Sequence, residues 1–203
     1  MAINLVKGQK IDLTKGNAGL SKIRVGLGWD AAKSKSTGLF GKIFGGQAGP
    51  NIDCDASVIM LDNQGHVNAK SDVVYFGHLT HASKAVVHMG DNLTGDGEGD
   101  DEQILIELKA IPENIDKLMF VVNIYDCVNR KQDFGMIGNA FIRIVDLSTN
   151  KELLRYNLTE DYSGYTALEV GEVYRHDGEW KFAATGNGTR DISLKNVVAK
   201  YQA

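Results

Sequence analysis

The chain has 203 residues, of which 43% are hydrophobic and 24% charged, a composition typical of a globular protein rather than a disordered one. Its two cysteines, Cys54 and Cys127, are too few for a disulfide framework. The first eight residues lack the charged start and apolar stretch of a signal peptide, and no apolar run reaches the roughly 18 residues of a membrane helix. These features predict one soluble domain over residues 1–203, located in the cytoplasm.

Alternating apolar and polar residues predict most of the secondary structure, because a period of two is typical of half-buried strands. The stretch 56–61 is apolar on both faces, as expected of a central strand. We expect strands at 23–29, 56–61, 104–108, 118–125, 140–145, 167–175 and 180–184. An Asp-Gly pair within His176–Glu179 predicts a hairpin turn. Helix is scarce, with one or two turns at 112–117 and an ambiguous helix or strand at 193–201. The class is a sandwich or a barrel.

The segment 33–49 interrupts this pattern, since it is rich in Gly, Ser and Lys and carries the apolar residues Leu39, Phe40, Ile43 and Phe44. We interpret it as a flexible insertion between two strands. The alternative is an exposed apolar and basic finger for a partner or a membrane surface.

An acidic loop at 90–102 is the most informative stretch. Within it are six acids and no Lys or Arg: Asp91, Asp96, Glu98, Asp100, Asp101 and Glu102. The whole chain has a net charge of −4, so this acidity is local, and a surface of this sign would repel nucleic acid. Calcium takes six to eight hard oxygen ligands, and interspersed glycines allow the backbone to bring several of them together. The loop therefore predicts a calcium site.

The loop is not an EF-hand, although Asp91 and Glu102 have the spacing of that motif's two ends. Leu93 and Gly95 occupy positions where an EF-hand needs ligands, and Asp96 replaces the glycine of the sharp turn. The flanking sequences also look like strands rather than helices.

Three further acids could join the loop: Asp30, Asp53 and Asp55. If the strands at 23–29 and 53–61 were antiparallel neighbours, all three would lie at one end of the fold. Asp53 and Asp55 are two residues apart on a strand and so point to the same side. With up to nine acids available, two calcium ions fit the charge better than one. The candidate ligands are Asp30, Asp53, Asp55, Asp91, Asn92, Thr94, Asp96, Glu98, Asp100, Asp101 and Glu102.

The sequence gives little support for a zinc site or for catalytic cysteines. His78 and His81 are spaced like a weak metal pair, but no cluster of Cys or Glu completes a tetrahedral zinc site. Cys54 and Cys127 do not form a Cys-x-x-Cys motif, and both lie in apolar, strand-like contexts that predict buried, inert thiols. No catalytic residues are assigned.

Several segments resemble the TerD family of bacterial tellurium-resistance and general-stress proteins. They are Val25–Asp30, Asp53–Ser57, the loop 90–102, Phe134–Gly135, Asn139–Ile144, Gly171–His176 and Gly178–Phe182. The resemblance spans nearly the whole chain and implies a β-sandwich of two mainly antiparallel sheets with little helix. It also implies bound calcium, usually two ions, and a role in stress or tellurite resistance. Two features depart from the family: Cys54 replaces an apolar residue, often Leu, and segment 33–49 is longer than expected.

Three functions remain open at this point. The first is a calcium-binding, non-enzymatic stress-response protein that acts as a scaffold or sensor, with protein partners in a stress-response complex. The second is a calcium-dependent membrane or lipid-docking module, suggested by segment 33–49. The third is a thiol-based oxyanion (tellurite) reductase, which would depend on Cys54 and Cys127.

Overall fold

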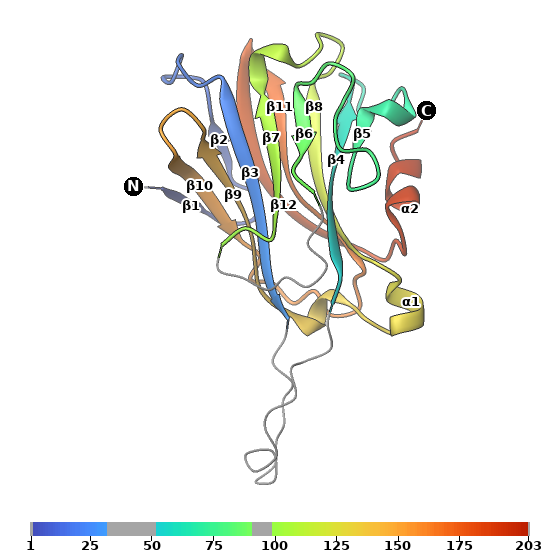
Figure 1. Ribbon diagram of the computed structural model, residues 1–203. Helices are drawn as coiled ribbons and strands as arrows, with labels where there is room; N and C mark the ends of the chain where they lie inside the picture. The colour runs from blue at the N-terminus through green and yellow to red at the C-terminus, as the bar shows by residue number, and fades with distance from the viewer. Residues whose placement is uncertain (1, 32–51, 91–98, 203) are drawn as a thin grey trace.

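The computed structural model describes residues 2–31, 52–90 and 99–202, and these form two stacked six-stranded sheets (Figure 1). The first sheet has the order β1 (Ile3–Leu5), β10 (Lys151–Asn157), β9 (Ile137–Asp146), β3 (Lys22–Ala31), β7 (Glu102–Glu107) and β6 (Val86–His88). The second has the order β2 (Lys10–Asp12), β12 (Glu179–Thr189), β11 (Ala167–His176), β8 (Lys117–Ile124), β4 (Cys54–Leu61) and β5 (Val73–Val74). Neighbouring strands are antiparallel except for β1 and β10. The predicted sandwich is confirmed.

Helices are short in the described part of the chain. They are η1 (Lys70–Asp72), η2 (Leu108–Ala110), α1 (Cys127–Arg130), η3 (Phe134–Met136) and α2 (Leu194–Ala199). The helix predicted at 112–117 is wrong, because a turn closed by the Ile115 N–H and the Pro112 carbonyl leads directly into β8. The ambiguous C-terminal segment is helical. Among the described residues, no helix is long and apolar enough to cross a membrane.

The main core lies between the two sheets. Ile23, Val25 and Leu27 alternate along β3 and are fully or almost fully buried, as the sequence pattern predicts. They belong to the same buried cluster as Phe120 of β8 and Phe182 of β12. Burial of this much apolar surface is the main stabilising contribution to a sandwich without disulfides.

A second, smaller core explains why β4 is apolar on both faces. Its residues Val58 and Met60 belong to the main core. Ile59 and Leu61 point the other way, into a cluster that also contains Val197 of α2. The short C-terminal helix therefore covers part of the outer face of the second sheet (Figure 1).

The expected strands all form, with somewhat different ends, but one relation between them does not hold. β3 and β4 belong to different sheets, so the strands that carry Asp30 and Asp53–Asp55 are not antiparallel neighbours. The hairpin between β11 and β12 forms where the Asp-Gly pair predicts it, and Asp177 and Gly178 have φ angles of 54° and 78°. Two positive φ angles in succession are typical of the type I′ turn.

Candidate metal centre

β3 ends and β4 begins near one end of the sandwich, and β7 begins beside the last part of β3 (Figure 1). β3 ends at Ala31, β4 begins at Cys54, and β7 begins at Glu102, which pairs with Leu27 of β3. β3 and β7 belong to the first sheet and β4 to the second, so this end joins the two layers.

Cys54 is surrounded by acidic groups. Its side chain is fully buried, and burial raises the pKa of its thiol well above the usual value. Four carboxylates lie close enough to raise this pKa further: Asp55, Asp53, Glu102 and Asp101. All four are predicted ligands, and they come from two separate segments of the chain.

Glu102 connects the two sheets at this point. It is 1% exposed, and its Oε2 accepts a hydrogen bond of 2.6 Å from the Ala56 N–H of β4. The Nε2 of His88, also buried, lies 3.3 Å from the same oxygen and 3.1 Å from the Ala56 carbonyl. Because His88 Nδ1 accepts from the Gly90 N–H, Nε2 carries the proton of the neutral ring and donates toward both oxygens. These contacts fix the Glu102 carboxylate in position.

Asp101 is held against β3 by both its backbone and its side chain. Its N–H donates to the Leu27 carbonyl at 2.8 Å. Its Oδ2 accepts from the Trp29 N–H at 2.7 Å. The last residues of the acidic loop are therefore attached to a rigid strand, which limits the movement of their carboxylates.

Asp53 and Asp55 lie at the start of β4, and their side chains are on the same face, as their spacing predicts. Cys54 and Ala56, which alternate with them, point the other way and belong to the core. Both acids are almost buried, at 9% and 5% exposure. Asp55 Oδ2 accepts from the Asn123 amide at 3.3 Å. Asp53 Oδ2 lies 3.4 Å from the nearest guanidinium nitrogen of Arg130 in α1. These are long contacts, weaker than hydrogen bonds of ideal geometry.

Asp100 points away from this group. Its side chain has no exposed surface, and its Oδ1 accepts from Arg143 Nε at 2.5 Å, while Arg24 Nε lies 3.8 Å from Oδ2. The hydrogen bond to Asp100 is the main reason that the pKa of Arg143 is raised. The carboxylate covers Gly26, where a Cβ atom would lie 2.2 Å from its carboxyl carbon. Asp100 is thus already neutralised by arginine, which makes it a weaker candidate ligand than Asp101.

This packing predicts that Gly26→Ala destabilises the protein by about 2 kcal/mol, because the new methyl group displaces the Asp100 carboxylate from Arg143. In an Asp100→Ala background the same change should cost little, so the double-mutant cycle should give a coupling energy of about 1.5 kcal/mol. Urea unfolding of the unsubstituted protein, the two single variants and the double variant measures this coupling energy. Gly138→Ala is the matched control, since its Cβ would meet only the Asp30 carbonyl oxygen at 3.9 Å. If the destabilisations caused by Gly26→Ala and Asp100→Ala were additive, the packing of the Asp100 carboxylate over Gly26 would be contradicted.

Asp30 is also separate from the group around Cys54. It is exposed, and its Oδ2 accepts from the Asn139 side-chain amide at 2.7 Å. The remaining predicted ligands, Asp91, Asn92, Thr94, Asp96 and Glu98, lie outside the described residues, as does the predicted insertion at 33–49. Within the described ranges, no three His, Cys, Asp or Glu side chains are arranged closely enough to hold a metal ion by themselves.

The histidines other than His88 make local contacts. His78 Nδ1 lies 2.8 Å from the Val73 carbonyl, and His81 Nε2 lies 3.3 Å from Asp72 Oδ1. The predicted structural role is consistent with these contacts. The sequence did not indicate the partnership of His88 with Glu102 or that of Arg143 with Asp100, because each joins segments that meet only in the folded chain.

Both cysteines are free and buried. Burial raises the pKa of Cys127 as it does that of Cys54, so at neutral pH both remain thiols rather than the more reactive thiolates.

Comparisons with known proteins agree on one family. The TerD domain matches residues 1–201. The chain is 61% identical over 201 residues to stress response protein SCP2 of Bacillus subtilis, covering 99% of this chain and all of the relative. It is 43% identical over 201 residues to tellurium resistance protein TerD of Serratia marcescens, covering 99% and 97% of the two chains. A crystal structure of a telluride resistance protein (TerD) homologue from Streptomyces coelicolor A3(2) has the same fold. Its TM-score is 0.62 at 20% identity, covering 88% of this chain and 98% of that one.

Proposed function

The chain belongs to the TerD family, which includes tellurium-resistance and stress-response proteins, and from this premise we propose that it is a calcium-binding protein without enzymatic activity. Its role is that of a calcium-dependent scaffold or sensor that contacts other proteins of a stress response in the cytoplasm. Calcium is a structural and regulatory ligand in this proposal and takes part in no reaction.

The observation that carries the proposal is the hydrogen bond from the Ala56 N–H to Glu102, because it joins the end of the acidic loop to the start of β4, where Asp53 and Asp55 lie. Carboxylates held close together in a partly buried site repel one another, and a divalent cation converts this repulsion into attraction. Glu102 and Asp101 are fixed by backbone N–H groups, each through one oxygen of the carboxylate. Oxygen donors of this type suit calcium, whereas zinc prefers sulfur and nitrogen.

The acidic loop supplies the other ligands in this proposal. Asp101 and Glu102 are its last residues, so the loop ends at the carboxylate group. Asp91, Asn92, Thr94, Asp96 and Glu98 belong to the same loop and complete the six to eight oxygens that a calcium ion takes. The large number of acids fits two ions, with Asp53 or Asp55 binding at least one of them. Asp100 and Asp30 contribute less, because their carboxylates are directed to Arg143 and Asn139.

The reductase alternative is disfavoured by the state of the two thiols. An oxyanion reductase needs an accessible thiolate and a second thiol to resolve the intermediate. Cys54 and Cys127 are buried, and the pKa of each is raised.

Calorimetric titration of the chelator-treated protein tests the proposal. We expect two calcium ions per chain and an affinity for calcium at least about tenfold higher than for magnesium, which corresponds to roughly 1.4 kcal/mol. Magnesium requires a near-octahedral set of short bonds and keeps its water, while calcium accepts an irregular set of many oxygens. Competition titrations at fixed millimolar magnesium measure the difference. Absence of any calcium-dependent heat would refute the proposal, and equal affinities would refute the selectivity.

A further inference from the structure

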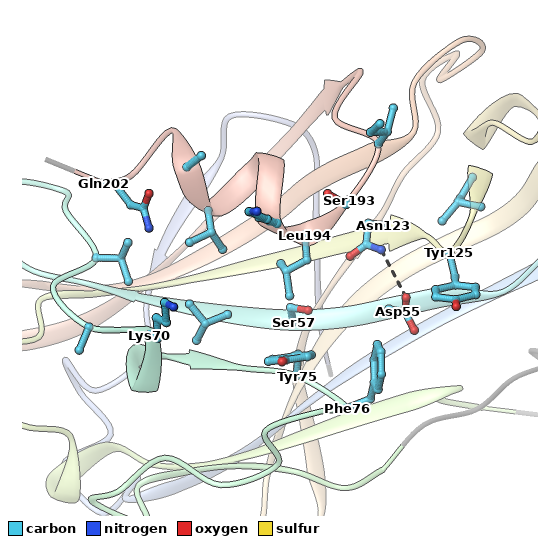
Figure 2. Close-up of a pocket in the computed structure, with 18 of the residues that line it drawn as sticks. Asp55, Ser57, Lys70, Tyr75, Phe76, Asn123, Tyr125, Ser193, Leu194 and Gln202 are labelled. Carbon is cyan, nitrogen blue, oxygen red and sulfur yellow. Dashed lines mark hydrogen bonds between the residues drawn. The ribbon is translucent and has the colours of Figure 1, made fainter. Parts of the chain in front are cut away.

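A groove of about 820 Å³ lies on the outer face of the second sheet, next to the carboxylate group (Figure 2). β4 and β8 form its floor, the segment 67–76 forms one wall, and α2 with the residues before it forms the other. The volume is within the range of pockets that bind small molecules, about 300–1,000 Å³.

The walls of the groove are largely apolar. Val67, Val73, Leu194 and Val198 line it, and aromatic rings stand at its mouth. Phe76 is 43% exposed and Tyr125 is 50% exposed, so both rings present apolar surface at the groove. One face of the Tyr125 ring is covered by the Arg130 guanidinium, 5.3 Å from its centroid.

The floor of the groove carries polar atoms without partners. Ser57 is fully buried, and its Oγ makes no hydrogen bond within the described residues. The amide nitrogen of Asn123 donates to Asp55, so its carbonyl oxygen faces elsewhere, and this buried oxygen also makes no hydrogen bond there. Figure 2 shows Ser57, Asn123 and Asp55 side by side on adjacent strands. Leaving such groups unsatisfied costs about 1–3 kcal/mol each, and a ligand with donor groups removes this cost.

The charges in the groove indicate which ligand fits. The floor presents the Asp55 carboxylate and the Asn123 carbonyl oxygen, which only accept hydrogen bonds, and the Ser57 hydroxyl, which can also accept. Asp126 also lines the groove and adds a negative charge, while Lys195 of α2 adds a positive one. Lys70 lies at the opposite end of the groove from Asp55 (Figure 2). The end near Asp55 therefore suits a positively charged hydrogen-bond donor.

We propose that this groove binds a small organic molecule with a protonated primary amine on an apolar body. The ammonium group donates to Asp55, to the Asn123 carbonyl oxygen and to the Ser57 hydroxyl. The apolar body lies along Leu194, Val198 and Tyr75. This site goes beyond the proposed calcium function, although Asp55 is near both ligands.

Three probes of similar shape test the head group: 2-phenylethylamine, 2-phenylethanol and 3-phenylpropanoate. Binding is measured by calorimetry and by chemical-shift changes, with calcium removed by chelator, so failure of this proposal is distinguishable from failure of the calcium proposal. We expect the amine to bind at least about tenfold more tightly than the alcohol, and the acid to bind least. Equal binding of amine and alcohol, or preference for the acid, would overturn the proposal.

Two substitutions locate the binding to the groove. Ala199→Trp places a large ring over an exposed lining position and should abolish binding of the amine. Ser57→Ala should weaken it by about threefold to tenfold through loss of one hydrogen bond. Ala110→Trp is the matched control, because Ala110 is also an exposed alanine but does not line the groove. Unchanged binding in the Ala199→Trp protein, with its melting temperature retained, would also overturn the proposal.

Discussion

Saturating calcium is expected to raise the melting temperature of the chelator-treated protein by about 5–10 °C. Calcium that binds only the native state at a hundred times its Kd adds about 2.7 kcal/mol to the free energy of unfolding. For a domain of this size, 1 kcal/mol corresponds to a shift of about 2–4 °C. Part of the effect comes from relief of repulsion among the acidic residues of the loop 90–102 and the start of β4.

Thermal melts by circular dichroism with chelator and with millimolar calcium measure this shift. Magnesium at the same concentration is the control for general ionic effects, and it should produce a much smaller change. Melting temperatures that are identical with chelator and with calcium would show that calcium does not bind the native state.

Replacing both Asp53 and Asp55 with Asn is expected to weaken calcium binding by at least about tenfold, or roughly 1.4 kcal/mol. The substitution keeps the size of both side chains and removes two negative charges. The fold should persist, because the β4 backbone remains paired with β8 along its whole length. Arg130 loses an ionic partner, but its side chain is 37% exposed and remains solvated.

Glu113→Gln is the matched control for this pair. It removes one carboxylate from an exposed position that precedes β8, whereas Cys54 pairs with Ile124 at the other end of that strand. The control should leave calcium affinity unchanged. Calorimetry on both variants, with circular dichroism to verify the strands, decides the result. An unaltered titration in the Asp53 and Asp55 variant would show that the calcium ligands lie elsewhere.

The adjacent residues Asp100 and Asp101 illustrate what the sequence does not reveal about the site. Both are acids at the end of one loop, and nothing in the sequence separates them. In the structure, Asp101 is held by the backbone of β3, while Asp100 packs over Gly26 and faces Arg143. Their difference depends on which face of the first sheet each side chain reaches, and that follows from the register of β3 with β7 and β9.

The sequence by itself determined the local features of this protein. The period of two in β3 and the Asp-Gly turn at 177–178 depend on neighbouring residues, so they could be read correctly without any tertiary information. The acidic loop was equally visible, because clustering of charge along the chain needs no folding. Strands such as β1 and β10 were missed because they are short or only weakly alternating.

Only the tertiary structure decided which strands share a sheet and which side chains meet. It placed β3 and β4 in different layers, with Glu102 crossing between them to the Ala56 N–H. It also placed Ser57 and Asn123 together on the floor of a groove that α2 closes. Such contacts join residues far apart in the chain, and they depend on the pairing and stacking of strands, which no pattern of neighbouring residues specifies.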